Sequence, residues 1–173
     1  MSGGELPLRW LVTGGCGFVG RNLSAFLTRT RPGDRIRILD DFSSATLEGL
    51  REAVPAAETA DAGGSDWGDV VTVLEGDVRD RAAVEGAMEG ADIVVHLAAN
   101  TGVKPSIDAP LEDCARNVTG TVVPLDVARE RGVRRFIFAS SGAPAGETTP
   151  PIREDIVPRP ISPYGASKLA GEA

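Results

Sequence analysis

The residue types most suited to catalysis lie close to the C-terminus, in Tyr164-Gly165-Ala166-Ser167-Lys168. The only tyrosine of the chain precedes one of its two lysines by four residues, and residues four apart share a face of a helix. A phenol with a pKa of about 10 is a poor base at neutral pH, but a nearby ammonium group favours the phenolate and lowers that pKa. The spacing predicts a general base at Tyr164 assisted by Lys168; an ordinary surface Tyr–Lys pair is the alternative.

Hydroxyl groups precede this pair in the sequence. Phe136-Ile137-Phe138-Ala139-Ser140-Ser141 is typical of a buried strand that ends in two serines. A hydroxyl donor, a tyrosine base and a lysine together make a site suited to hydride transfer, which neither segment makes alone.

A glycine-rich turn near the N-terminus offers a site for phosphate. It reads Thr13-Gly14-Gly15-Cys16-Gly17-Phe18-Val19-Gly20 and lies between a predicted strand and a predicted helix. Such glycines permit a tight turn, close approach of backbone to pyrophosphate and close helix–strand packing. The free N–H groups around Phe18 and Val19 would then face the phosphates.

An acidic residue follows this turn at the distance expected for a dinucleotide site. Asp40 lies twenty positions after Gly20 and ends the second predicted strand, in Ile38-Leu39-Asp40-Asp41. A carboxylate there accepts the ribose hydroxyls and repels a 2′-phosphate, which favours NAD over NADP. A solvated loop acid is the alternative interpretation.

Two further segments fall at the carboxyl ends of predicted strands, where open α/β sheets bind ligands. They are Gly76-Asp77-Val78 and His96-Leu97-Ala98-Ala99. The small residues Ala98 and Ala99 would let a flat ring approach the backbone. His96 ends an apolar strand, and we interpret it as a structural histidine and not as a base.

The order of elements predicts a doubly wound parallel α/β sheet. Short apolar runs typical of strands covered on both faces alternate with helical stretches. Strands are predicted at Arg9–Thr13, Arg35–Leu39, Val70–Leu74, Ile93–Leu97 and Arg134–Ala139. Helices are predicted near Gly17–Arg29, Ala45–Ala53, Arg81–Met88 and Pro110–Arg131, with a last one opening at Ser162 or Pro163. The acidic, glycine-bearing segment 56–69 is predicted to be a surface loop.

Composition narrows the class of protein further. The chain has 173 residues, which indicates one domain, and its net charge of −7 argues against nucleic acid as a partner. No apolar run approaches the roughly 20 residues that a membrane span requires, and the N-terminus lacks the pattern of a signal peptide. Cys16 and Cys114 have no metal-like spacing, so we expect two reduced thiols, no metal site and a cytoplasmic protein.

The ordered motifs TGGCGFVG, LDD, GDV, HLAA, NVTGT, FASS and YGASK resemble the extended short-chain dehydrogenases/reductases, in particular their NAD-dependent epimerase/dehydratase branch. This resemblance covers nearly the whole chain. It implies a Rossmann-type sheet in a single NAD-binding domain over residues 1–173, bound NAD, and a nucleoside-diphosphate sugar as substrate.

The resemblance also implies roles for individual residues. Tyr164 would be the base, Lys168 would contact the nicotinamide ribose and lower the pKa of the tyrosine, and Ser141 would bind the reacting hydroxyl. The residues expected to contact the cofactor are Gly14, Gly17, Phe18, Val19, Gly20, Asp40, Asp41, Asp77, Val78, Leu97, Ala98, Ala99, Asn117, Ser140, Tyr164 and Lys168.

Two departures from the family pattern bear on the reaction. Family members continue for well over a hundred residues that form most of the sugar-nucleotide pocket, so we expect the C-terminal substrate domain to be missing here. The 4,6-dehydratases carry Asp-Glu after the active-site hydroxyl residue, whereas this chain has Gly142-Ala143. We therefore expect an epimerase acting at C4 of a hexose through a transient ketone. The alternatives are a non-catalytic or split NAD-binding fragment and, third, a dehydratase. A homodimer or a complementing C-terminal chain is the expected protein partner.

Overall fold

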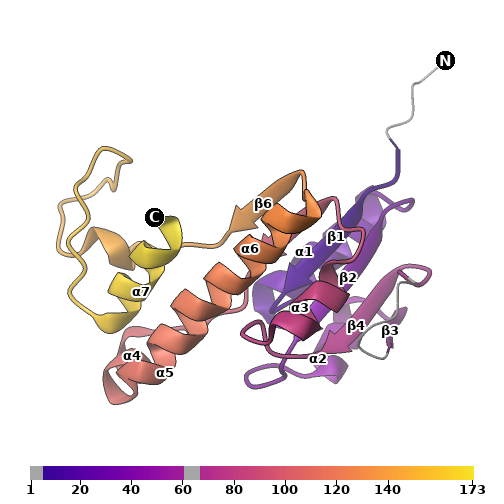
Figure 1. Cartoon of the computed structure of the whole chain (residues 1–173), viewed down its shortest axis with the longest axis horizontal. Coiled ribbons are helices and arrows are strands. Elements are labelled where there is room, and N and C mark those ends of the chain that lie inside the picture. The colour runs from indigo at the N-terminus through magenta and orange to yellow at the C-terminus, as the bar shows by residue number, and fades with distance from the viewer. Residues whose placement is uncertain (1–5, 61–66) are drawn as a thin grey trace.

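The computed structural model of the chain describes residues 6–60 and 67–173. Within these ranges six parallel strands form one sheet in the order β3-β4-β2-β1-β5-β6 (Figure 1). The strands are β1 (Arg9–Thr13), β2 (Arg35–Asp40), β3 (Ala57–Thr59), β4 (Val71–Glu75), β5 (Ile93–His96) and β6 (Arg135–Phe138). The order reverses between β1 and β5, so the crevice at the carboxyl ends of these two strands is the place where such sheets bind ligands.

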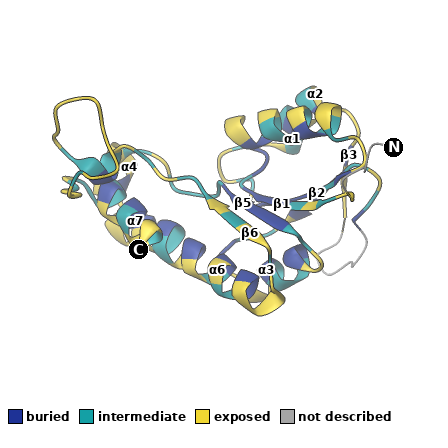
Figure 2. Cartoon of the chain, turned by 90° about the horizontal axis from the view of Figure 1, so that it is seen from above, coloured by how far each residue is buried: buried dark blue, intermediate teal, exposed yellow. Residues whose placement is uncertain are grey.

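Helices cover both faces of the sheet (Figure 2). α1 and α2 lie on one face, and α3 and α6 lie on the other. The helices are α1 (Phe18–Thr30), α2 (Leu47–Ala53), α3 (Arg81–Met88), α4 (Val103–Asp108), α5 (Pro110–Cys114), the π-helical segment η1 (Ala115–Thr119), α6 (Gly120–Arg131), the 3₁₀ turn η2 (Ala143–Ala145) and α7 (Pro163–Glu172). The doubly wound parallel architecture expected from the sequence is confirmed.

Successive apolar residues of each central strand enter two different cores. In β2, Ile36 and Ile38 pack with the cluster under α1 and α2, whereas Leu39 packs with the cluster under α3 and α6. Side chains alternate between the faces of a strand, so a strand covered on both sides needs apolar residues at consecutive positions. Arg37 is the exception in β2: it is fully buried, donates to the carbonyl oxygens of Gly86 and Ala87, and lies over the Trp67 ring.

The prediction of a surface loop over 56–69 is wrong in part. Residues 57–59 form the edge strand β3, paired in parallel with β4, and Trp67 is only 5% exposed and donates its indole N–H to the carbonyl oxygen of Glu89. Residues 61–66 of that segment lie outside the described residues. A three-residue strand paired on one side needs no apolar run, so Ala57-Glu58-Thr59 carries no strand pattern.

Residues Pro110–Arg131, predicted to form one long helix, are helical throughout, with a π-helical turn between α5 and α6. The short helix α4 before them was not predicted. α7 opens at Pro163 as expected, with the Ser162 hydroxyl accepting the N–H of Gly165. Among residues 6–60 and 67–173, no helix combines the length and the apolar character needed to cross a membrane.

Candidate functional site

A pocket of about 480 Å³ lies at the carboxyl edge of the sheet and brings together segments far apart in the sequence. The turn before α1, the ends of β2, β4 and β5, the segment after β6, η1 and α7 all contribute to its wall. Its lining includes fifteen predicted site residues: Gly14, Gly17, Phe18, Val19, Gly20, Asp40, Asp41, Asp77, Val78, Leu97, Ala98, Ala99, Ser140, Tyr164 and Lys168.

At two of its positions the glycine turn packs too tightly against neighbouring backbone to admit a side chain. A Cβ on Gly14, whose φ is +64°, would lie 2.7 Å from the backbone nitrogen of Ala98, and a Cβ on Gly20 would lie 2.5 Å from the Cα of Gly15. Gly17 is the N-cap of α1, with no side chain capping the helix and no acidic residue in its first turn. The N–H groups that open α1 therefore face the pocket with the positive end of the helix dipole, an arrangement suited to a phosphate.

Asp40 holds the turn and the β2 loop together. Its carboxylate accepts the backbone N–H of Cys16 at 2.9 Å and that of Phe42 at 3.0 Å, and the residue is 7% exposed. Burial raises the pKa of Asp40, an effect that the two backbone hydrogen bonds oppose. Burial, together with the neighbouring Asp40, raises the pKa of the Cys16 thiol to about 12, so this thiol stays protonated at neutral pH.

Tyr164 and Lys168 both line the pocket from α7, as the i, i+4 spacing predicted. Lys168 is 5% exposed, and its ammonium group donates to the carbonyl oxygen of Ala139 at 3.0 Å and lies 4.9 Å from the centre of the Phe138 ring. Burial lowers the pKa of Lys168, and the charge of Asp113 partly offsets that change. The lysine is thus anchored to the end of β6, the segment that leads to the two serines.

Of those serines, Ser140 lines the pocket, whereas Ser141 is not among the described residues of the lining. The Ser141 hydroxyl accepts the backbone N–H of Ala143 at 3.2 Å and is half-buried. Ser140 donates to the carboxylate of Glu172 near the end of α7. The structure thus ties Ser140 to α7 and Ser141 to the start of η2.

Asn117 lies behind the pocket wall in a buried hydrogen-bond network. Its amide group accepts the backbone N–H of Asn100 and donates to the carboxylate of Asp113 and to the hydroxyl of Ser167. Asp113 in turn accepts the Ser167 hydroxyl at 2.7 Å. This network ties the helical run α5–η1 to α7 at the residue next to Lys168, so it fixes the orientation of the Tyr–Lys face.

His96 is buried at the end of β5 and is 1% exposed. Its two ring nitrogens make hydrogen bonds with the hydroxyls of Thr13, at 2.7 Å, and Thr121, at 3.3 Å. Burial, with a smaller contribution from the charge of Lys168, lowers the pKa of His96 to about 4. The ring is therefore neutral at physiological pH and joins β1 to α6, which agrees with the structural interpretation of this residue.

Sequence reasoning missed Arg116, which lines the pocket from η1. Its guanidinium group donates to the hydroxyl of Ser43 at 3.0 Å and lies 3.5 Å from the carboxylate of Asp41. On the neighbouring part of the wall, the Asp77 carboxylate is bound by Arg79, which lowers the pKa of Asp77. Arg116 belongs to none of the recognised motifs and is distant in sequence from Asp41, so no local pattern predicts its place in the pocket.

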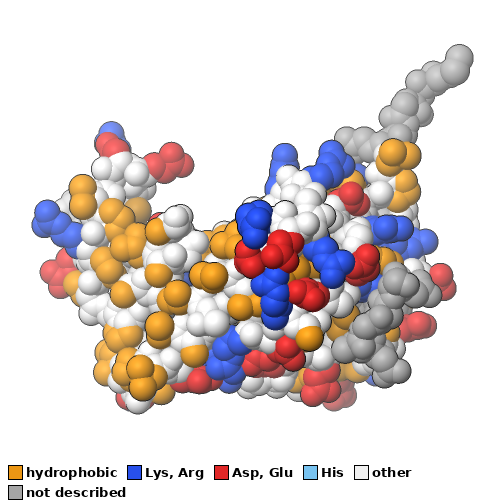
Figure 3. All heavy atoms as spheres, viewed as in Figure 1, with side chains coloured by type: hydrophobic (Ala, Val, Ile, Leu, Met, Phe, Trp, Pro, Cys, Tyr) orange, Lys and Arg blue, Asp and Glu red, His pale blue; other side chains and the backbone are white. Residues whose placement is uncertain are grey.

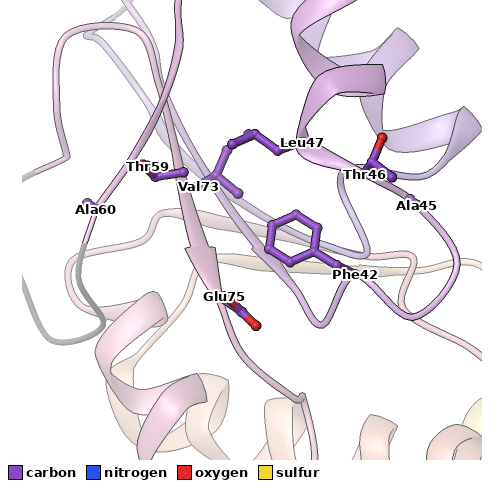
Figure 4. A pocket seen from close by; sticks show the side chains of 8 residues that line it. All are labelled: Phe42, Ala45, Thr46, Leu47, Thr59, Ala60, Val73 and Glu75. Carbon is purple, nitrogen blue, oxygen red and sulfur yellow. The ribbon is translucent and has the colours of Figure 1, made fainter.

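A second pocket, of about 710 Å³, lies on the other side of the turn after β2 (Figure 4). Phe42, whose φ of 53° is in the left-handed region, places its ring there beside Leu47 and Val73, and Glu75 lies at the border. This pocket is larger, but none of the predicted site residues lines it. The candidate site is therefore the smaller pocket, where the glycine turn and the Tyr–Lys pair meet.

The pocket residues fit a dinucleotide. The uncapped start of α1 suits a pyrophosphate, Asp40 and Asp41 at the end of β2 suit ribose hydroxyls, and the small Ala98 and Ala99 leave room for a flat ring. Both cysteines are free thiols, Cys16 buried and Cys114 exposed. Among the residues that the structure describes, no group of three or more His, Cys, Asp or Glu side chains is placed to hold a metal ion.

Comparison with known proteins supports this interpretation. Residues 10–173 match the model of the NAD dependent epimerase/dehydratase family. The chain is 38% identical over 167 residues to a UDP-glucose 4-epimerase of Corynebacterium glutamicum, covering 94% of this chain and 44% of that protein. A dTDP-glucose 4,6-dehydratase of Mycobacterium tuberculosis is 30% identical, with 95% of this chain and 47% of that protein covered.

The solved structures agree. A UDP-glucose 4-epimerase of Thermus thermophilus in complex with NAD superposes with a TM-score of 0.80 at 32% identity, over 95% of this chain and 49% of that one. The chain thus spans about half the length of the relatives that it matches. NAD is the cofactor of this family, and NAD complexes are among the structural neighbours. With its parallel sheet, its glycine turn and a family match over residues 10–173, the chain belongs to the NAD-dependent epimerase/dehydratase family.

Proposed function

We propose that the chain forms the cofactor half of an enzyme that epimerises a nucleoside-diphosphate hexose at C4. One observation carries the proposal: Tyr164 and Lys168 line the same pocket as the glycine turn and the end of β2. A base and a dinucleotide site in one pocket are the requirements of reversible oxidation at a carbon that bears a hydroxyl group.

In this proposal NAD, when bound, supplies a reversible acceptor for the hydride of C4. The residues of the chain handle the hydroxyl group of the sugar. Tyr164 takes the proton from the C4 hydroxyl as the ketone forms and returns it after the ketone has turned over. Ser141 donates a hydrogen bond to the same oxygen. Lys168 lines the same pocket four residues after Tyr164 on α7.

The relatives support epimerisation more than elimination of water. The UDP-glucose 4-epimerases among them reach 38% identity, against 30% for the dTDP-glucose 4,6-dehydratase. Gly142 and Ala143 follow Ser141 and carry no acid to move protons in an elimination. UDP-glucose and UDP-galactose are therefore the first substrates to test.

A second candidate is NAD binding without turnover by these 173 residues. It rests on the share of the relatives that the chain spans, which is 44% of the C. glutamicum epimerase and 49% of the T. thermophilus chain. Contacts to the nucleotide end of a sugar nucleotide position the reacting carbon, so a chain that lacked them would bind the cofactor and turn over slowly.

We also propose that the helical run α5–α6 meets a protein surface, either a second copy or a complementing C-terminal chain. Hydrophobic side chains gather over this run in Figure 3, and Leu111, Val122 and Leu125 are 87%, 55% and 40% exposed. Val122 and Leu125 are three residues apart in α6 and so share one face of that helix, and exposed apolar side chains of this kind are typical of an interaction surface.

The substitution Tyr164→Phe tests the proposed function. We expect interconversion of UDP-glucose and UDP-galactose by the protein to fall about 10²- to 10⁴-fold, because the general base is lost. NAD binding, followed by native mass spectrometry, should remain. Conversion of either sugar nucleotide to a 4-keto-6-deoxy product would support the dehydratase instead, and an unchanged rate for Tyr164→Phe would contradict the role of Tyr164.

A further inference from the structure

Arg116 links η1 to the residues that follow β2 at the edge of the pocket. Its Nε donates to Glu112 at 2.6 Å, and its Nη1 donates to the Ser43 hydroxyl at 3.0 Å and lies 3.5 Å from a carboxylate oxygen of Asp41. The other oxygen of Asp41 accepts both the backbone N–H and the hydroxyl of Ser43. Asp41, Ser43 and Arg116 therefore form one cluster, and all three line the pocket.

Asp40 and Asp41 differ in the exposure and the hydrogen-bond partners of their carboxylates. Asp40 is 7% exposed, and each of its oxygens already accepts a backbone N–H, from Cys16 or Phe42. The Asp41 side chain is 35% exposed and faces Arg116. Arg116 is thus paired with two carboxylates, Glu112 and Asp41, and of these only Asp41 lines the pocket, whereas Asp40 mainly holds the turn.

The donors in this cluster suit a phosphate. Among the described residues, Arg116 and Lys168 are the cations that line the pocket, and Lys168 lies at its other end, bound to Ala139. A guanidinium group beside a hydroxyl is a common phosphate ligand, and an arginine near the acidic residue after the second strand is how related folds accept the 2′-phosphate of NADP.

We propose that Asp41 and Arg116 are a specificity-determining pair for the dinucleotide. Arg116 Nη1 and the Ser43 hydroxyl present the donors that a ribose 2′-phosphate requires, and Asp41 occupies them from the pocket side and repels that phosphate. The preference for NAD over NADP then depends on Asp41 as well as on Asp40. This inference rests on the proposed cofactor site and adds a residue contributed by η1.

A double-mutant cycle tests the pair, with Asp41→Asn, Arg116→Ala and the double variant titrated calorimetrically with NAD and with NADP. For D41N we expect the ratio of NADP affinity to NAD affinity to rise about tenfold, because a charge–phosphate contact replaces a repulsion. Adding R116A to D41N should remove the gain. The ratio of NADP to NAD that copurifies, measured by native mass spectrometry, should likewise be higher in D41N than in the unsubstituted protein and the double variant.

Asp108→Asn is the matched control. Asp108 is an exposed carboxylate paired with Lys104 on α4, so its loss changes the net charge by the same amount away from Asp41. A gain of NADP affinity in D108N equal to that in D41N, a gain that survives R116A, or an unchanged ratio of affinities in D41N would each overturn the proposal. Failure of the unsubstituted protein to bind either dinucleotide would overturn it together with the cofactor site. NAD binding without epimerisation would contradict only the proposed catalysis.

Discussion

Individual buried polar residues join neighbouring elements by hydrogen bonds at the carboxyl edge of the sheet. His96 is the clearest case, because it is buried, neutral and hydrogen-bonded through both ring nitrogens to threonines of β1 and α6. A positive charge there would lie in an apolar environment and near Lys168, which is why the pKa of His96 falls to about 4. His96 should therefore contribute to the pH dependence of the free energy of unfolding.

Between pH 6.5 and pH 4 the unfolded chain binds a proton at residue 96 that the folded chain does not. The stability linked to His96 is therefore complete above pH 6.5 and is lost as the pH falls toward 4. The loss amounts to about 3 kcal/mol, at about 1.4 kcal/mol for each pH unit. Urea unfolding at several pH values between 7.5 and 4.5 measures this slope.

His96→Gln supplies the control for that measurement. The variant should be less stable at pH 7.5, because packing and hydrogen bonds are disturbed, but its free energy of unfolding should fall less steeply below pH 6.5. Parallel curves for the two proteins would assign the acid sensitivity to carboxylates elsewhere.

Among the structural elements, the turn between β1 and α1 needs glycine for two different reasons, packing against backbone at Gly20 and space for a ligand at Gly17. Gly20 packs against the backbone of Gly15, and a Cβ there would lie 2.5 to 2.7 Å from three of its atoms. Gly17 has an ordinary φ of −66°, and the nearest atom to its Cβ would be the carbonyl oxygen of Gly14 at 3.3 Å. Both glycines line the pocket, but only Gly20 is required by the packing of the turn.

The pair Gly20→Ala and Gly17→Ala should therefore lose different properties. G20A must displace backbone, so we expect a loss of at least about 2 kcal/mol in the free energy of unfolding, or no folded protein. G17A should stay within about 1 kcal/mol of the unsubstituted chain, yet bind NAD about tenfold more weakly, because its methyl group enters the space for the pyrophosphate. Thermal unfolding and calorimetry check the two effects, and equal losses of stability would contradict the distinction.

For the molecule as a whole, the dinucleotide pocket is enclosed by packed segments of this chain, whereas other apolar surfaces are left exposed. The segments around the pocket are held in place by hydrogen bonds, from Cys16 to Asp40, from Asn117 to Ser167 and from Lys168 to Ala139. α7 lies away from the sheet, beside α4 and α5 (Figure 1), and apolar side chains of α5 and α6 are exposed. Cofactor binding is thus better supported by this chain than substrate binding.

We expect the 173 residues by themselves to bind NAD and to epimerise UDP-galactose at least about 100-fold more slowly than the same chain joined to the C-terminal half of the C. glutamicum relative. Remote contacts to the nucleotide raise turnover as well as affinity, so their loss affects both. A coupled assay for UDP-glucose, with NAD occupancy measured on both proteins, makes the comparison. Equal turnover by the two would show that the substrate is bound within residues 1–173.

The sequence by itself determined the features that depend on near neighbours. Consecutive apolar residues predicted strands covered on both faces, the glycines predicted the turn before α1, and a spacing of four placed Tyr164 and Lys168 on one face of α7. These features follow from local periodicity and backbone geometry, which a short stretch of sequence carries in full.

Only the tertiary structure decided the features that join distant segments. Arg116 and Ser43 are 73 residues apart, Asn117 reaches Ser167 across 50, and the edge strand β3 is defined only by its pairing with β4. The burial of Arg37 under Trp67 is of the same kind. Each depends on where the packed elements bring a side chain or a backbone edge, and no pattern within one element records that position.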